Sequence, residues 1–556
     1  MKINFAYDKQ NQIHNYVYEL SKKHCGNYEV SDNFDDSDYE ISLKTDLSLE
    51  SEAYKIEFIS NKNIIISASD KLGLLYGVGR FFHKGNSLNE NEYKTPEKKI
   101  RGIYFATHFN NYYQEAPIEK LLDYTEELVF WGANSIAMWF DMHHFYNIND
   151  PSAQKLLHRM KLIYIKAKEI GLKTTLCMLS NEYYYGAKEE FLATNSIEDT
   201  EYFAKPIGYY HKELCPSVPE AKELLITSHM EVINEFKEPG LDYIWFHPYD
   251  QGGCTCESCR PWGSNGFIKL SFDLINELRK TNLSTTCILS TWRFDCFTNG
   301  EWQYIVDNMS KISKYFKYIM ADFEFRGIPN NLKEIANKHG VNLVGFPEIS
   351  MTAVPWGGFG ATPVPERTEN LYKRLENMHQ GGFAYSEGIF EDINKVIILG
   401  LYFGNSSAKE TVKDYFRFYF SEDTVKLANE FINCLEELIE RNRINADGEI
   451  NNYPTDDYVE NLPTFKIHKT GKIKRACELA EIIKNKLPIS IQNSDRFKIL
   501  YLRTVIDKAL IENDGYISIK TETAAKELEE IFYAQNSDYA VAPITENAIR
   551  NNKGHI

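Results

Sequence analysis

Acidic and imidazole side chains recur at the ends of eight short apolar runs between Arg101 and Phe403. The runs are RGIYFAT, NSIAMWFD, KTTLCML, YIWFHPYD, TCILSTW, YIMADFE, NLVGFPE and GGFAYSEG. The residues that end or closely follow them are His108, Asp141, Glu182, Asp250, Trp292, Asp322, Glu348 and Glu387. One carboxyl group can donate a proton while a second one activates water or attacks directly. The set therefore indicates acid–base chemistry at a shared site.

The order of these runs predicts the elements that bring the side chains together. Each run is β-branched or aromatic and precedes a helical pattern, which gives eight βα units in about 300 residues. This is the repeat of a closed (β/α)8 barrel, an α/β fold whose chemistry lies at the carboxyl ends of the strands. A barrel mouth lined by carboxylates, His and Trp points to a sugar as the substrate.

Asp250 is the first candidate for the general acid, because a Gly pair that lets a ligand approach the backbone follows it closely. Glu348 lies across the predicted barrel and is the candidate nucleophile or base. The alternates for this second role are Glu387, Asp322 and Glu324. The competing interpretation is that these carboxylates cap helices or pair with Arg293 and Arg326.

Other polar and aromatic side chains near the strand ends are candidates for binding the substrate. Trp faces stack on sugar rings, and imidazole, amide and guanidinium groups bond hydroxyl groups. The Trp residues could equally belong to the core, and Trp356 on a Gly-rich loop is the best stacking candidate. The predicted set is His108, Asp141, His143, Gln251, Trp292, Arg293 and Trp356.

Cysteines cluster after the fourth predicted strand. Cys254, Cys256 and Cys259 lie within six residues, and Cys215 could supply a fourth ligand. Such a set can hold a structural zinc, although unligated thiols that stabilise a loop are the alternative. The proposed acid–base chemistry itself requires no cofactor.

Composition indicates which kinds of partner and which cellular location to expect. The 556 residues carry a net charge of −17, which disfavours nucleic acid as a partner. No apolar stretch is long enough for a membrane span, and the N-terminus lacks the features of a secretory signal. The scattered cysteines are typical of reduced thiols, so we expect a cytoplasmic protein.

Pattern changes divide the chain into three predicted domains. Residues 1–97 read as an α/β domain, residues 98–404 as the barrel, and residues 405–556 as a helical domain. In the first domain, Gly73, Gly77 and Gly79 have the wrong spacing for a dinucleotide-binding loop. We expect these glycines to allow close packing of a helix on a sheet.

The segment LGLLYGVGRFFH, after the strand-like NIIISASD, resembles the small N-terminal domain of several exo-glycosidases. Bacterial N-acetylhexosaminidases, O-GlcNAc hydrolases and microbial α-glucuronidases share that domain, and the barrel opening RGIYF is similar to the same group. The motif resemblance covers residues 1 to about 110, and the rest of the chain is similar in architecture. It implies an exo-acting glycosidase.

The end of the fourth strand differs among these families. N-acetylhexosaminidases have an Asp-Glu pair there and O-GlcNAc hydrolases an Asp-Asp pair, whereas this chain has Asp250-Gln251. The α-glucuronidases take one acid from the fourth strand and candidate bases from strands six and seven. Asp250, Asp322 and Glu348 match that layout.

We therefore expect an exo-acting glycoside hydrolase that releases a terminal N-acetylhexosamine or related sugar from an oligosaccharide. The alternatives are an α-glucuronidase-like inverting hydrolase of uronic-acid glycosides, a non-catalytic carbohydrate-binding barrel, and a metal-dependent lyase or isomerase. The expected partner is a glycoside, with no nucleic acid and no membrane; a homodimer is left open.

Overall fold

An N-terminal six-stranded sheet packs against helix α2 (Lys71–Lys84). The computed structural model describes residues 1–31, 36–108, 111–206, 213–249, 252–281, 284–321, 328–350, 360–438, 470–513 and 518–532. The strand order is β2-β1-β3-β5-β4-β6, and β4 runs antiparallel to β5 and β6. The elements are β1 Lys2–Ala6, α1 Gln12–Lys23, β2 Glu29–Val30, β3 Tyr39–Thr45, β4 Tyr54–Phe58, β5 Asn63–Ala68 and β6 Glu92–Lys94.

The glycines of α2 allow the helix to approach its neighbours closely, as the sequence predicted. A Cβ at Gly73 would lie 2.4 Å from the carbonyl oxygen of Ala53, and one at Gly79 would lie 2.2 Å from that of Phe130. Real Cβ atoms do not reach such distances from backbone. Because Phe130 belongs to the barrel, the same helix touches both the N-terminal sheet and the barrel.

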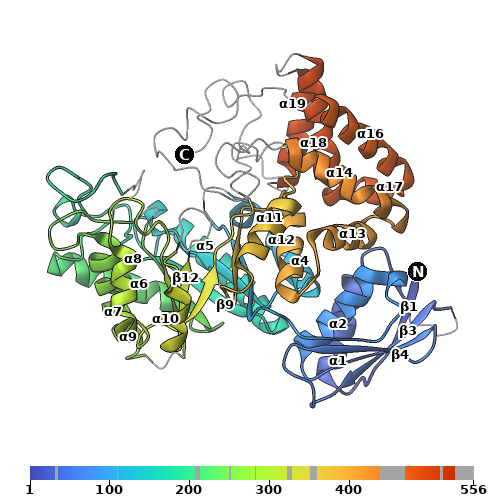
Figure 1. Cartoon of the computed structure of the whole chain (residues 1–556), viewed down its shortest axis with the longest axis horizontal. Helices are drawn as coiled ribbons and strands as arrows, with labels where there is room; N and C mark the ends of the chain where they lie inside the picture. Colours follow the sequence, from blue (N-terminus) through green and yellow to red (C-terminus); the bar gives the residue numbers. More distant parts are fainter. Residues whose placement is uncertain are drawn as a thin grey trace.

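Eight parallel strands close into a barrel in the order β10-β11-β12-β13-β14-β7-β8-β9. Pairing of β14 with β7 from Gly381↔Ile100 to Ser386↔Phe105 completes the ring. The predicted (β/α)8 class is thereby confirmed (Figure 1). The strands are β7 Ile100–Phe105, β8 Ser135–Trp139, β9 Lys173–Leu179, β10 Tyr243–His247, β11 Thr286–Ser290, β12 Tyr318–Ala321, β13 Asn342–Gly345 and β14 Gly381–Ser386.

Helices between the strands cover the outside of the barrel. The segment 301–312 forms two short helices, α8 (Glu301–Asp307) and α9 (Met309–Ile312). Because the two helices are short and separated at Asn308, the apolar residues of this segment show only a weak helical periodicity. The others are α3 Tyr112–Glu115, α4 Ile118–Phe130, α5 Pro151–Ile170, α6 Pro219–Glu235, α7 Phe267–Leu278, α10 Leu332–Lys338, α11 Pro365–Leu375 and α12 Asp392–Phe403.

The described residues after Gly404 are largely helical, in agreement with the prediction. They form α13 Ala408–Tyr419, α14 Val425–Leu438, α16 Thr470–Lys486, α17 Ile489–Gln492, α18 Asp495–Glu512 and α19 Ile519–Phe532. Figure 1 shows these helices stacked beside the barrel, next to α11 and α12. None of the helices that the structure describes is long and apolar enough to cross a lipid bilayer.

A largely buried ionic network, centred on Asp392, joins these C-terminal helices to the barrel. Arg496 of α18 donates from Nε to Asp392 of α12 at 2.7 Å and from Nη2 to Glu127 of α4. Tyr124 and Tyr415 also donate to Asp392, at 2.5 and 2.8 Å. Asp392 is 1% exposed, so its charge depends on these donors.

Candidate active site

Six of the eight predicted strand-end residues lie among the described residues at the mouth, meaning the carboxyl-terminal ends of the barrel strands. Each follows its strand by no more than three residues, because the strand sets where the loop begins. They are His108, Asp141, Glu182, Trp292, Glu348 and Glu387; Glu387 is partly buried and the others are buried. Asp250, Gln251, Asp322, Glu324 and Trp356 lie outside the described residues.

Asp141, His143 and Glu182 form one hydrogen-bonded cluster beyond β8 and β9. Nδ1 of His143 lies 3.0 Å from Oδ1 of Asp141 and 3.5 Å from Oε2 of Glu182. Nε1 of Trp139 donates to both oxygens of Glu182, at 3.0 and 3.1 Å. His144 contacts the second oxygen of Asp141 at 3.1 Å. The sequence had singled out Glu182 as a strand end but not as a site residue.

The two carboxyl groups of this cluster have opposite protonation preferences. Burial raises the pKa of Glu182 well above its usual range, and the charge of Asp141 adds to that effect. Burial also disfavours ionisation of Asp141, but hydrogen bonds from His143 and His144 outweigh it and hold the pKa of Asp141 far below the usual range. One protonated and one ionised carboxyl therefore face a single imidazole.

His108 extends the cluster toward β7. Its Nε2 lies 3.2 Å from the hydroxyl group of Tyr104, and its ring packs edge-on against Trp139 at 4.8 Å. Burial lowers the pKa of His108 to about 4, so the imidazole is neutral near neutral pH. A neutral ring can both donate to and accept from a sugar hydroxyl.

Glu348 and Glu387 form a second pair of carboxyl groups, just after the adjacent strands β13 and β14. Oε1 of Glu348 accepts a 2.8 Å hydrogen bond from the amide of Ser350. Burial raises the pKa of Glu387 well above its usual range, and the charges of Glu391 and Glu348 raise it further. The hydroxyl group of Tyr385 donates to Glu387 at 3.4 Å.

Glu391 anchors the segment that carries Glu387. Its Oε1 accepts from the amides of Glu387 and Gly388 at 2.5 and 2.6 Å, and from the hydroxyl group of Ser386 at 2.8 Å. Lys395, one turn further along α12, donates to the carbonyl of Gly388. The sequence did not identify Glu391. It lies four residues after Glu387, and that spacing alone does not show that its side chain turns back toward the strand.

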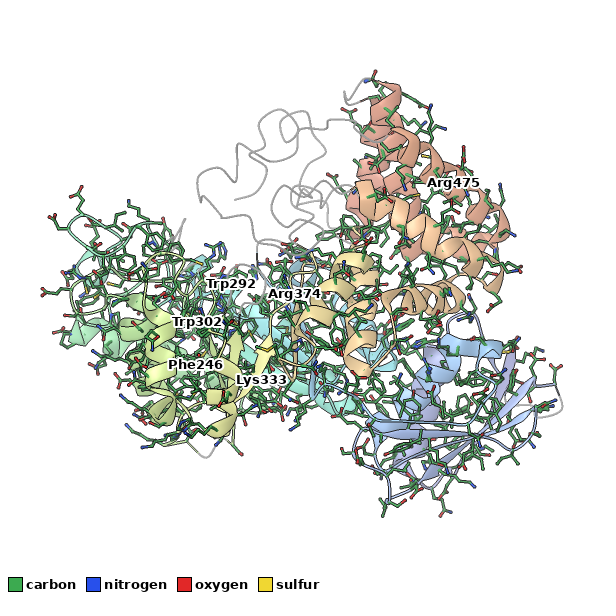
Figure 2. All side chains as sticks on the ribbon, viewed as in Figure 1. Phe246, Trp292, Trp302, Lys333, Arg374 and Arg475 are labelled. Atoms are coloured by element: carbon green, nitrogen blue, oxygen red, sulfur yellow. The ribbon has the colours of Figure 1, made fainter. Side chains whose placement is uncertain are left out.

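Aromatic rings fill the barrel interior beneath these groups. Phe346 contacts Trp245 and Trp292 edge-on, at centroid distances of 4.7 and 5.5 Å. Figure 2 shows Trp292 in the barrel part of the molecule. His247 lies 6.0 Å from Trp292, and burial lowers its pKa to about 3. Alternation along β10, with Trp245 facing inward, could have identified His247 from the sequence.

Arg293, a predicted binding residue, directly follows Trp292 and adopts a positive φ of 56°. Its charge lowers the pKa of His247, after the larger effect of burial. The positive charge of the Arg293 guanidinium group therefore lies close enough to the mouth to change the pKa of a group there. Trp262, by contrast, is fully buried and donates to the carbonyl of Pro248 at 2.6 Å, so it belongs to the structural core.

The four predicted cysteine ligands meet in space. The Sγ atoms of Cys215, Cys254, Cys256 and Cys259 all lie within 4.8 Å of one another. Asp141, His143 and Glu182 have a similar spacing. Within this second group, Nδ1 of His143 is bonded to Oδ1 of Asp141, and both oxygens of Glu182 accept from Trp139.

Comparison with known proteins shows which solved structures have a similar fold. No protein-family model and no curated protein matches the chain. A GH89 enzyme from Clostridium perfringens, solved with its substrate GlcNAc-α-1,4-galactose, has a TM-score of 0.57 and 10% identity over 94% of this chain and 64% of that one.

Two further solved structures cover more of their own length. A GH115 4-O-methyl-α-glucuronidase specific for decorated arabinogalactans has a TM-score of 0.56 and 11% identity, over 96% of this chain and 77% of that one. A GH138 enzyme that targets pectin rhamnogalacturonan II has a TM-score of 0.55 and 12% identity, over 96% and 88%. The chain thus has the fold of a broad group of glycoside hydrolases, with a barrel between an N-terminal sheet and C-terminal helices.

Proposed function

We propose that this protein is an exo-acting glycoside hydrolase that works by carboxyl acid–base chemistry at the barrel mouth. The observation that carries the proposal is the gathering of carboxyl groups at the strand ends, where burial raises the pKa of Glu182 and Glu387 and hydrogen bonds lower the pKa of Asp141. Glycosidic cleavage requires this combination, because one carboxyl must protonate the leaving oxygen while another attacks or activates water. The similarity in fold to glycoside hydrolases supports it.

Glu348 is our proposed nucleophile or base. Asp250 is the proposed general acid, and Glu387 is the alternate, because its raised pKa keeps a proton available near neutral pH. His108, His143 and Arg293 would bind sugar hydroxyl groups, and Trp292 would pack against the ring.

The proposed substrate is a terminal N-acetylhexosamine or a related sugar on an oligosaccharide. A uronic-acid glycoside is the second candidate, since Arg293 near the mouth offers a cation to a sugar carboxylate. A non-catalytic carbohydrate-binding barrel is the outcome if sugars bind without turnover. The chemistry needs no cofactor, and a zinc ion on the four cysteines would have a structural role. A cytoplasmic location and a homodimer remain predictions.

Aryl glycosides of N-acetylhexosamines, uronic acids and common hexoses test the activity, in both anomers. Asp250→Asn, Glu387→Gln and Glu348→Gln then separate the roles. Loss of the acid should lower kcat/KM by roughly 10²–10⁴-fold on a poor leaving group and much less on an acidic phenol, which departs without protonation. Loss of the nucleophile or base should affect both substrates. If none of the three variants changes hydrolysis, the assignment is wrong.

A further inference from the structure

The cysteines from two separate loops have the spacing of a metal centre. Cys215 precedes α6, while Cys254, Cys256 and Cys259 follow β10. The Sγ atom of Cys215 lies 3.6 Å from that of Cys254, 3.7 Å from Cys256 and 3.9 Å from Cys259. Zinc–sulfur bonds of about 2.3 Å in a tetrahedron place the sulfur atoms about 3.8 Å apart. The observed separations match that edge.

We propose that these four thiolates bind one zinc ion, and that this ion clamps together the loops that follow the third and fourth barrel strands. Disulfide formation does not explain the spacing, because bonded sulfur atoms lie about 2.05 Å apart. Four protein ligands leave no open position on zinc, so the ion would be structural.

The backbone around Cys256 and Cys259 forms a tight turn, as expected for a segment that supplies several ligands to one ion. The amides of Cys259 and Arg260 both donate to the carbonyl of Cys256 at 3.0 Å, which folds the segment tightly around the sulfur atoms. Cys215, Cys254 and Cys259 are buried, whereas Cys256 is partly exposed and offers a route for the ion. Binding replaces the thiol protons, which leave to solvent, by one divalent cation.

Asn181 connects the cysteine cluster with the mouth. Its Nδ2 donates to the carbonyls of Leu214 and Gly253 at 3.1 and 2.9 Å, and its Oδ1 accepts from the amide of Gly253 at 3.1 Å. The residues next to Cys215 and Cys254 thus bond to one side chain at the end of β9. Glu182, the next residue, pairs with Glu213 in an isolated bridge.

The clamp therefore sets the position of Asn181 and Glu182 relative to Gly253, which follows Asp250 in the chain by three residues. Its effect on activity rests on the proposed glycosidase function, whereas metal binding does not. We expect loss of the ion to let these loops shift and so to lower kcat, although no residue of the mouth is replaced.

Elemental analysis of the full chain, purified after growth with zinc, tests the site directly. We expect about one zinc per chain, and exchange with Co²⁺ should give the thiolate charge-transfer and strong visible bands of tetrahedral sulfur ligation. Cys254→Ser should lose both signals. The matched control is Cys477→Ser, whose position in α16 lies outside the cluster and whose side chain can keep the hydrogen bond to Thr504.

Three outcomes separate the two proposals. Stoichiometric metal with no cleavage of any glycoside supports the site and refutes the glycosidase. Glycoside cleavage without metal, and without a cobalt–thiolate spectrum, overturns the site. Metal whose removal leaves kcat unchanged shows binding without the clamp, and this also contradicts the inference. If Cys254→Ser does not fold, the spectrum of the unmodified chain still decides whether metal binds.

Discussion

The amide of Glu387 donates a 2.5 Å hydrogen bond to Oε1 of Glu391, a carboxylate on the first turn that follows the same strand. Glu391 thereby orients a mouth residue through its backbone and raises its pKa through its charge. The two effects can be separated, because a neutral amide oxygen keeps the hydrogen bond and removes the charge.

We predict that Glu391→Gln moves the basic limb of the kcat/KM pH profile to lower pH. Removing the negative charge lowers the pKa of Glu387, so the proton of an acid catalyst is lost earlier as pH rises. Full pH profiles on one aryl glycoside measure this. Glu430→Gln, at an exposed pair with Arg475, is the control. An unmoved limb in a folded variant would contradict a role for Glu387 as acid.

The raised pKa of Glu182 makes a prediction about stability. Folding raises the pKa of this carboxyl from its ordinary value of 4.5. Its contribution to the free energy of unfolding is therefore fully present below pH 4.5, and it is lost as the pH rises through the folded-state pKa. Glu182→Gln keeps an acceptor for Trp139 without an ionisable group. Its Tm relative to the unmodified protein should therefore increase from acidic to alkaline pH.

Asp141→Asn is the matched opposite case. Because folding lowers the pKa of Asp141, its stabilisation is present above the unfolded-state pKa and disappears as pH falls. This variant should lose most stability at neutral pH and least in acid. Thermal melts of both variants across pH measure the two slopes, and slopes of the same sign would refute the protonation states assigned here.

Arg496→Met should destabilise the protein by about 3 kcal/mol, since it removes the guanidinium group that donates to the buried Asp392. Arg475→Met is the control, because Arg475 lies on the outer C-terminal helices and its ion pairs are exposed (Figure 2). Denaturant unfolding measures both. Addition of Asp392→Asn to Arg496→Met should restore part of the loss, and equal losses for the two arginines would argue against a structural role for the network.

Gly79→Ala should destabilise the protein by roughly 1–3 kcal/mol, because its Cβ would overlap the backbone of Phe130. Gly471→Ala provides the comparison, since no heavy atom lies within 4 Å of that Cβ and alanine favours the helix. Thermal or denaturant unfolding measures both. A neutral Gly79→Ala would show that the helix can shift without cost.

Local patterns explain how much of this protein could be predicted. The runs that became β7 to β14 are short, apolar and spaced by helical patterns, so the barrel and residues such as Glu348 followed from periodicity alone. The cysteine cluster was also accessible, because three of its members lie close in sequence.

Contacts between distant segments could not be predicted in the same way. Arg496 and Asp392 are 104 residues apart, and nothing near either residue indicates the other. The opposite pKa shifts of Asp141 and Glu182 depend equally on three-dimensional burial and on which neighbours donate hydrogen bonds. Sequence reasoning therefore gives the candidate carboxyl groups but not their protonation states.

The contacts of Asp392 also limit how the chain can be divided. A fragment that ended at Gly404 would retain every barrel strand, yet it would lack Tyr415 and Arg496, which both donate to that buried carboxylate. Transplanting the barrel onto a different C-terminal region would have the same effect unless the new region supplied a guanidinium group at that point. The stable unit that contains the barrel is therefore expected to extend into α18, and fragments or chimaeras should include that helix.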